Sequence, residues 1–397
     1  MKPRRKTRKA VVQTSGLGLD RLLRPTWAEI SLPALRRNYQ RIRERAGRRQ
    51  VMAVVKADAY GHGSVAITKC LAACGVDWFG VATVEEGIEL RAAGIQQPIL
   101  LLGGLYMSDP ADLVEYRLTP SVSSTARLDT YAECARRAGR PIEFHLKVDT
   151  GLGRLGVPLD RLRPFLERYQ ELEGLAMTGV FTHLASASDL VACQTEEQLV
   201  RFDAALKQLP WFEIEPTWVH VSNSASLLVH PGIAENLVRV GALFYGYYLP
   251  LITLPGREPQ NLPAFEPILT FKSRVVYLKD VPSGSPLGYG ASFYTRRPSR
   301  VATVPVGYAD GLSRGLSNRG HVIINDRHAR IVGQISMDLT LLDVTDLPGV
   351  AVGDEIIVIG KSESCQITAL DIAAQLGTVP YEVLCSIGKR VPRIYVD

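Results

Sequence analysis

Short apolar runs alternate with amphipathic segments along the first two thirds of the chain. The amphipathic segments, such as SVAITKCLAACG and TVEEGIELRAAG, have helical spacing, and several end at a glycine. Short apolar runs fit strands buried on both faces, and strands that alternate with helices are joined by parallel crossovers. The eight runs are Met52–Val55, Trp78–Ala82, Ile99–Leu102, Thr119–Val122, Ile142–Val148, Met177–Thr182, Trp218–Ser222 and Leu237–Val240. The pattern predicts an α/β fold whose first domain is a closed (β/α)8 TIM barrel rather than an open sheet.

The segments on either side of this region complete the predicted organisation. Ser31 suits the N-cap of a helix that reaches about Ala46, with Pro33 in its first turn. From the proline-bearing segment 261–267 onward, turn residues separate short β-rich runs, and one helix is expected over 368–376. The predicted parts are a basic, disordered tail over residues 1–24, the barrel over 25–261, and a mostly β C-terminal domain over 262–397.

Polar residues follow the predicted strands, at the end of a barrel where the chemistry lies. They are Lys56, Tyr60, Lys147, Asp149, Arg154, His183, Asn223, Ser224 and Arg239. Lys56 ends a buried run, where desolvation lowers the pKa of a lysine, and such a lysine can form a Schiff base. The alternative, that Lys56 merely ends a strand and reaches towards water, stays open from this residue alone.

The sequence GLGRLG at 151–156 matches the glycine pattern of a dinucleotide-binding turn, and Glu171 follows at a suitable distance. The match is weak because it follows the fifth predicted strand instead of opening a βαβαβ unit. Arg154 inside the turn offers a planar fork for a carboxylate. We therefore favour a carboxylate-binding role over a nicotinamide site.

The loops after the last two predicted strands contain small polar residues, SNS at 222–224 and Gly241-Ala242. Barrels often hold a phosphate at these loops through backbone N–H groups. Helix capping without any ligand is an equally open interpretation.

Several other candidates also have simpler explanations. Arg239 is always charged and needs an acceptor, which a structural salt bridge would supply, and His183 could be a hydrogen-bonded core histidine. A tyrosine that acts as a base needs its pKa lowered from about 10 by a cation or by hydrogen bonds. Turn-like segments of the second domain hold Tyr289, Tyr308, Asp310, Met337 and Asp338.

Composition and charge narrow the function classes. The chain has 397 residues, 46% of them hydrophobic and 22% charged, which is typical of a soluble enzyme. Six basic residues within the first nine account for the net charge of +6, so a nucleic-acid partner has little support. No apolar run is long enough to span a membrane, and residues 10–22 lack the core of a signal peptide. The six cysteines lack paired metal-ligand spacing and fit buried thiols in a reducing cytoplasm, so no metal is expected.

Together these motifs closely resemble the alanine racemase family, which consists of fold-type III enzymes that use pyridoxal 5′-phosphate (PLP). The resemblance runs from about residue 25 to the C-terminus. It is carried by AVVKADAYGHG, KVDTGLGRLGV, FTHLASA, HVSNSAS, VRVGALFYG, GYGASF, VPVGYADG, GQISMDL, PYEVLCSI and KRVPRIY. It implies a cytoplasmic homodimer that interconverts L-alanine and D-alanine and supplies D-alanine for cell-wall peptidoglycan.

The resemblance also implies roles for the cofactor-binding residues. Lys56 would hold PLP and act as one base, and Tyr289 of the partner subunit would act as the other. Arg239 would face the pyridine nitrogen, and His183 would support the ring and Arg239 or poise Tyr289. The residues implied around the phosphate are Tyr60, Ser224, Gly241, Ala242 and Tyr381, and Asn223 is expected as a further cofactor-binding residue.

The substrate side of the site is implied in the same way. Arg154 and the backbone of Met337 would take the substrate carboxylate. Lys147 matches a position that is often carbamylated, which would turn a cation into an anion able to orient Arg154. Tyr308 and Asp338 match positions at the substrate entrance.

This sequence departs from the family pattern at Ser336, where many members have cysteine, at Gly388-Lys389, and in its longer basic tail. None of these touches a predicted base. A racemase of broader range that acts on serine is the main alternative, although an aromatic at Tyr381 argues for a small substrate. A PLP carrier barrel would leave Tyr289 without a role. A decarboxylase would be expected to carry a glycine-rich phosphate loop of its own and a cysteine-bearing second-domain site.

Overall fold

The computed structural model describes residues 23–104 and 109–397, which group into two compact units. Most of the predicted tail, residues 1–22, lies outside the described residues. The barrel unit contains residues 31–268 and 369–386, and the β unit contains residues 23–30, 269–368 and 387–397. These limits differ from the predicted boundaries at 25, 261 and 262. The differences arise from long-range pairing, because β1 (Thr26–Ser31) joins β11 (Leu269–Arg274) while α11 (Pro380–Cys385) packs on α2 (Lys56–Gly61).

Eight parallel strands form the barrel unit, in the hydrogen-bonded order β10-β2-β3-β4-β5-β6-β8-β9. Two backbone hydrogen bonds complete the ring between the first and last of these, from Asn236 N to Val219 O at 3.1 Å and from Arg239 N to Ser222 O at 3.0 Å. The strands are β2 (Gln50–Val54), β3 (Trp78–Val81), β4 (Ile99–Leu101), β5 (Thr119–Val122), β6 (Ile142–Asp149), β8 (Leu175–Phe181), β9 (Trp218–His220) and β10 (Leu237–Val240). The prediction of a (β/α)8 barrel is confirmed.

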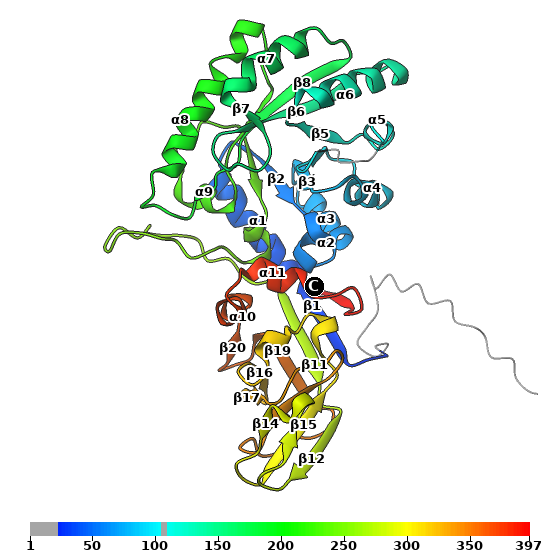
Figure 1. Cartoon of the computed structure of the whole chain (residues 1–397), viewed down its shortest axis with the longest axis vertical. Coiled ribbons are helices and arrows are strands. Elements are labelled where there is room, and N and C mark those ends of the chain that lie inside the picture. The colour runs from blue at the N-terminus through cyan, green and yellow to red at the C-terminus, as the bar shows by residue number, and fades with distance from the viewer. Residues whose placement is uncertain (1–22, 105–108) are drawn as a thin grey trace, which may run out of the picture. The chain divides into compact units, whose positions relative to one another are not determined.

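Helices surround these strands, as Figure 1 shows. Ser31 caps α1 as predicted, with its side chain accepting from Ala34 N at 3.3 Å. The α-helices of the barrel unit are α1 (Leu32–Ala46), α2, α3 (Ser64–Ala73), α4 (Val84–Ala92), α5 (Ala111–Glu115), α6 (Thr125–Ala138), α7 (Leu159–Gln170), α8 (Gln194–Leu206), α9 (Ser224–Val229), α10 (Ala369–Leu376) and α11. The short strand β7 (Val157–Pro158) and the 3-10 helices η2 (Leu209–Phe212) and η3 (Ala242–Tyr245) lie between them.

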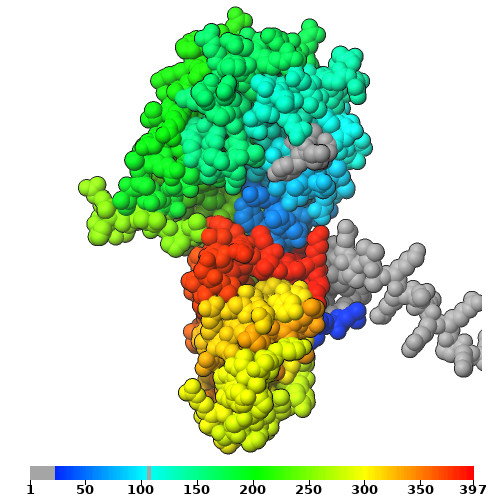
Figure 2. Space-filling model, viewed as in Figure 1, coloured from blue at the N-terminus to red at the C-terminus, as the bar shows by residue number. Residues whose placement is uncertain are grey.

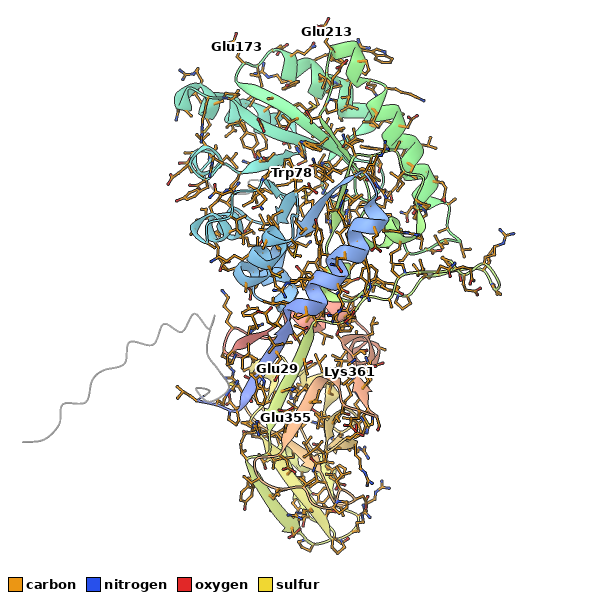
Figure 3. All side chains as sticks on the ribbon, turned by 180° about the vertical axis from the view of Figure 1, so that it is seen from behind. Glu29, Trp78, Glu173, Glu213, Glu355 and Lys361 are labelled. Carbon is orange, nitrogen blue, oxygen red and sulfur yellow. The ribbon has the colours of Figure 1, made fainter. Side chains whose placement is uncertain are left out.

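Large side chains fill the barrel interior. Met52, Trp78, Leu100 and Leu237 form one buried cluster contributed by four adjacent strands, and Figure 3 shows Trp78 among these strands. Side chains thus pack the interior between these strands, as is usual for barrels of this class.

The β unit is built on a mostly antiparallel sheet in the order β12-β15-β18-β17-β16-β19-β11-β1-β21, so the predicted mostly β domain is confirmed. On β11, Lys272 forms ion pairs at 3.0 Å with Glu29 and with Glu355, both labelled in Figure 3. The remaining strands are β12 (Tyr277–Val281), β13 (Pro286–Leu287), β14 (Phe293–Tyr294), β15 (Ser299–Val304), β16 (His321–Ile324), β17 (Arg327–Ile331), β18 (Thr340–Asp343), β19 (Glu355–Lys361), β20 (Gln366–Ile367) and β21 (Arg393–Val396).

One extended segment, residues 247–266, projects from the body of the barrel unit in the space-filling view of Figure 2. Backbone hydrogen bonds tie it to the segment before α8, from Leu190 N to Ile252 O and from Ile252 N to Ser188 O. Ile252 and Leu254 expose apolar side chains on it.

The six cysteines are free thiols. The expectation of buried thiols is wrong, because Cys193 and Cys385 are exposed and the other four are only partly buried. Cys193 precedes α8 and Cys385 ends α11, and helix ends lie towards the surface. Among the described residues, no helix combines the length and apolarity needed to cross a membrane.

Candidate active site

A cavity of about 700 Å³ opens in the barrel unit at the carboxyl ends of the strands. Eleven of the residues predicted from the sequence line it: Lys56, Tyr60, Lys147, Arg154, His183, Asn223, Ser224, Arg239, Gly241, Ala242 and Tyr381. They come from both halves of the barrel and from α11, so the fold brings together residues more than 300 positions apart.

The cavity is strongly cationic. Lys56, Lys147, Arg154 and Arg239 line it, and among the described residues no aspartate or glutamate does. Four positive charges within one concave site focus a positive potential into it. The cavity therefore suits a ligand that carries several negative charges.

Lys56 follows β2 and reaches this cavity from a half-buried position. Burial is the main cause that lowers its pKa, and the charge of Arg154 lowers it further, whereas Glu86 and Cys385 act in the opposite direction. A larger fraction of Lys56 is therefore unprotonated at neutral pH than for a lysine in water. An unprotonated amine can act as a nucleophile or as a base.

The residues after Lys56 form a left-handed turn. Ala57, Asp58, Ala59 and Tyr60 all have φ between 52° and 55°, a conformation that costs roughly 1–2 kcal/mol for each residue with a side chain. His62 Nδ1 donates to the carbonyls of Ala59 and Tyr60, both at 2.9 Å. This turn aims Lys56 and Tyr60 into the same cavity from positions only four residues apart.

Tyr60, Ser224 and Gly241 make a tight corner of the cavity. Gly241 N donates to Ser224 Oγ at 3.1 Å, and a Cβ atom at Gly241 would lie only 2.6 Å from the hydroxyl of Tyr60. The Tyr60 ring packs on Tyr245 and edge-on against Tyr381. Burial raises the pKa of Tyr60, which keeps its hydroxyl protonated and able to donate.

Asn223 has a structural task in the same corner. Its side-chain oxygen accepts from Ala225 N at 3.0 Å and Ser226 N at 3.1 Å, at the start of α9. The helix-cap interpretation therefore holds for this side-chain oxygen, although Asn223 also lines the cavity.

Arg239 is almost fully buried, with 4% of its surface exposed. Its guanidinium donates to Thr182 O at 2.7 Å, Val221 O at 3.0 Å, His220 Nδ1 at 2.9 Å and His183 Nδ1 at 3.3 Å. The simple explanation of a structural salt bridge does not describe these contacts, because all four partners are neutral groups. Burial lowers the pKa of Arg239 to about 10, so it remains charged at neutral pH.

Two buried histidines, His220 and His145, continue the hydrogen-bond network that begins at Arg239. Sequence reasoning missed both. Since an arginine cannot accept, His220 Nδ1 must accept and its protonated Nε2 must donate to His145 Nδ1, 2.8 Å away. Burial and the charge of Arg239 lower the pKa of His145 to about 3 and that of His220 well below its usual range, so both are neutral. A histidine inside an apolar strand, as in IEFHLK and WVHVS, was the available signal.

Lys147 lies in β6, two residues before the end of the strand, and is 5% exposed. Burial first, then the charges of Arg154 and Arg239, lowers its pKa to about 8. Its ammonium nitrogen lies 5.6 Å from the centre of the Phe181 ring, which also stacks on His220 and lies 5.0 Å from the guanidinium of Arg239.

The GLGRLG motif shapes the loop that carries Arg154. Asp149 Oδ1 accepts from the backbone N–H groups of Gly151 at 3.0 Å and Gly153 at 3.1 Å. Gly156 has φ of 134°, and a Cβ there would lie 2.5 Å from Asp149 N. The glycines are thus required by this turn, which follows the fifth barrel strand.

Gln198 of α8, another residue that sequence reasoning missed, holds two of the site's loops together. It is fully buried, donates to Thr150 Oγ1 at 3.2 Å and His183 O at 3.1 Å, and accepts from Ala185 N at 2.8 Å. A buried glutamine is rare without such partners, but the sequence alone gave no sign of which loops it binds.

The other predicted site residues belong to the β unit. Tyr308 N donates to Ser336 O at 3.1 Å, which places Tyr308 next to Met337, and Asp338 pairs with Arg390 at 2.7 Å. Tyr289 lies in the turn after Gly288 and has 74% of its surface exposed. Tyr308 and Met337 are also exposed, so this unit presents several large side chains to its surroundings.

Comparison with known proteins gives consistent matches over most of the chain. Residues 30–249 match the family model "Alanine racemase, N-terminal domain", and residues 268–395 match "Alanine racemase, C-terminal domain". The alanine racemase 2 of Caldanaerobacter subterraneus subsp. tengcongensis is 39% identical, over 94% of this chain and 95% of that protein.

Solved structures agree with these matches. The alanine racemase of Clostridium difficile 630 superposes with a TM-score of 0.86 at 35% identity, covering 95% of this chain and 97% of that one. The alanine racemase of Bartonella henselae, solved with covalently bound pyridoxal phosphate, has a TM-score of 0.82 at 29% identity and covers 94% of this chain and 99% of that one.

Proposed function

This chain belongs to the alanine racemase family, and on this premise we propose that it interconverts L-alanine and D-alanine with PLP as its cofactor. The observation that carries the proposal is the placement of Lys56. It lies at the end of a barrel strand with a lowered pKa, in a cationic cavity without lining carboxylates among the described residues.

The residues of the cavity fit PLP. A phosphate and a phenolate oxygen match its positive charges. The missing Cβ of Gly241 leaves the Tyr60 hydroxyl and a backbone N–H close together, as a small anionic group requires. Lys56 would hold the cofactor through its Nζ atom, and Arg239 would face the pyridine nitrogen. The proposed phosphate contacts are Tyr60, Asn223, Ser224, Gly241, Ala242 and Tyr381.

PLP, when bound, supplies the sink for the electron pair left at the substrate's α-carbon. The chain supplies the proton transfers. Racemisation removes the α-proton from one face and returns a proton to the other, so two bases on opposite faces suffice. We assign Lys56 to one face and Tyr289 of the partner subunit to the other. Arg154 and the Met337 backbone would hold the substrate carboxylate.

Arg239 has a second consequence for the reaction. It remains charged and its hydrogen atoms point to neutral acceptors, so it cannot accept a proton from the pyridine nitrogen. His183 contributes by accepting from the same guanidinium. We propose that this arrangement limits charge spreading into the ring and favours rapid reprotonation over side reactions.

Lys147 is a proposed carbamylation site. Carbon dioxide adds to a neutral amine, which then loses a proton, and the pKa of about 8 leaves part of Lys147 neutral at neutral pH. The resulting carbamate would carry a negative charge beside Arg154 and orient its guanidinium towards the substrate.

We infer a homodimer, because the proposed second base, Tyr289, is an exposed residue of the β unit and is not among the described residues that line the barrel cavity. The exposed Tyr289, together with Tyr308 and Asp338 as entrance residues, would be supplied by the partner subunit. We also propose that the protein works in the cytoplasm and supplies D-alanine for peptidoglycan. Six free thiols fit a reducing compartment, and cell fractionation would test this location.

The decisive experiment compares racemisation of L-alanine, L-serine and L-lysine by the PLP-loaded protein, with Lys56→Ala as the control. We expect alanine to be the fastest substrate and Lys56→Ala to be inactive. A dominant rate on serine would replace the alanine assignment with the broader-specificity alternative. Full activity of Lys56→Ala would overturn the proposed chemistry.

A further inference from the structure

Glu86 connects the strand-end turn of β3 to the turn that carries Lys56. Its Oε2 atom accepts from Ala82 N at 2.7 Å, and its Oε1 atom accepts from Ala57 N at 2.6 Å. Ala57 directly follows Lys56 and lies 29 positions before Glu86 in the chain. One carboxylate therefore bridges the ends of two neighbouring barrel strands.

The contact with Ala57 meets a particular need of the left-handed turn. The first N–H groups of any helical turn lack partners within the turn, whichever its hand. His62 binds the carbonyls at the far end of this turn, and Glu86 binds the N–H at its start. The turn is thus held at both ends by side chains, in a conformation that Ala57 to Tyr60 would not adopt by themselves.

We propose that Glu86 is a positioning residue, which fixes Lys56 and Tyr60 relative to each other by binding the N–H between them. Lys56 and Tyr60 would contact two different groups of the cofactor, its aldehyde carbon and its phosphate, so a turn that fluctuates would misplace both contacts together. This inference rests on the proposed function, in which Lys56 holds PLP and Tyr60 contacts its phosphate.

Glu86 also acts on Lys56 through its negative charge. Arg154 lowers the pKa of Lys56, Lys147 carries a further positive charge nearby, and Glu86 and Cys385 raise the pKa of Lys56. Glu86 does not line the cavity. It therefore offsets positive charge near Lys56 without placing a carboxylate against an anionic ligand.

Glu86 also has a structural task that a test must separate from positioning. It is the third residue of a capping box at the start of α4, in which Thr83 Oγ1 accepts from Glu86 N at 3.4 Å. Thr83→Ala removes that bond and leaves the carboxylate on Ala57. It is therefore the matched control for Glu86→Gln, whose carboxamide has one acceptor oxygen for the three N–H groups, those of Ala57, Ala82 and Thr83, that the carboxylate binds.

Three measurements on the PLP-loaded full chain distinguish the variants. In Glu86→Gln we expect PLP release to be about 10–100-fold faster, by analogy with the loss of residues that orient the ligands of a bound metal. We expect kcat to fall while KM for alanine changes little, because Arg154 is untouched. Amide hydrogen exchange should accelerate in the peptide covering residues 56–61. Thr83→Ala should match wild type in all three.

The outcomes decide the inference. If Glu86→Gln and Thr83→Ala behave alike in PLP release and exchange, Glu86 is only a helix cap and the proposal is wrong. If Glu86→Gln does not fold, Glu86→Asp serves instead, since it keeps the charge but is too short to span both N–H groups. Normal PLP release in Glu86→Asp would then overturn the proposal. Because hydrogen exchange needs no substrate, a wild-type protein without racemase activity would refute the proposed function and leave this test intact.

Discussion

Arg239 donates from Nη1 to Nδ1 of His220 at 2.9 Å, so at neutral pH a charged side chain is bound by a neutral one. The direction of this hydrogen bond determines which ring nitrogen of His220 carries the proton. His220 must carry its proton on Nε2 and donate it to His145. Neutral carbonyl and imidazole groups therefore hold the Arg239 guanidinium by hydrogen bonds. The negative charge of Glu235 further favours the charged form of Arg239 by raising its pKa.

Replacing His220 tests this relationship. His220→Leu leaves a buried guanidinium N–H without an acceptor, which typically costs about 1–3 kcal/mol in the free energy of unfolding. His220→Gln can still accept through its amide oxygen and should lose less stability and less activity. Urea unfolding and racemisation rates measure both effects. Equal stability of the leucine and glutamine variants would show that the bond to Arg239 is unimportant.

Lys147 should make stability depend on pH in a defined direction. Its pKa is about 8 in the folded state and 10.5 in the unfolded chain. Below pH 8 both states bind the proton and the full penalty of burying the charge is present. That penalty disappears as the pH rises towards 10.5, because the folded protein then holds a neutral amine.

Lys147→Met removes this penalty. In carbon dioxide-free buffer we expect the variant to be more stable than wild type at pH 7, by on the order of 3 kcal/mol. The difference should shrink steadily when unfolding is measured up to pH 9.5. Adding bicarbonate should stabilise wild type alone if Lys147 is carbamylated. A difference that stays constant with pH would contradict the lowered pKa.

Gly241→Ala should weaken PLP binding by steric conflict. The new Cβ atom would lie 2.6 Å from the Tyr60 hydroxyl and 3.2 Å from the ring carbon that bears it. Tyr60→Phe removes the closer atom, so the double variant should recover part of the binding energy lost by Gly241→Ala. Gly232→Ala is the control, since nothing lies within 4 Å of a Cβ atom there. Equilibrium titration with PLP compares the four variants with wild type, and strictly additive losses in Gly241→Ala, Tyr60→Phe and the double variant would argue against the conflict.

The strand pattern was predictable because it is local. Apolar runs of four to seven residues identified all eight barrel strands, and the ends of five of them then located polar residues such as Lys56 and Arg239. The left-handed turn was not predictable, because alanine and tyrosine have no preference for positive φ and the turn depends on Glu86 and His62. For the same reason His145 could be seen as buried but not as a partner of His220.

The boundary between the two units shows a related limit. The sequence linked residues 369–386 to the β-rich region that precedes them, whereas the structure places them in the barrel unit. The contact that decides this is the approach of Leu384 to Gly61, where a Cβ would lie 2.3 Å from the Leu384 carbonyl oxygen. The sequence around Gly61 does not show that a backbone segment more than 300 residues later packs against it.

Mixing two inactive variants tests whether the partner subunit completes each site. In a heterodimer of Lys56→Ala and Tyr289→Phe, one barrel keeps Lys56 and receives the intact Tyr289 from the partner subunit, while the other site carries both changes. Random subunit exchange in a symmetric dimer makes half of the dimers mixed, so about a quarter of wild-type activity should return. If each barrel used its own Tyr289, no site would be intact and no activity would return. Each variant mixed with itself is the control, and matched melting temperatures would exclude loss of folding as the cause.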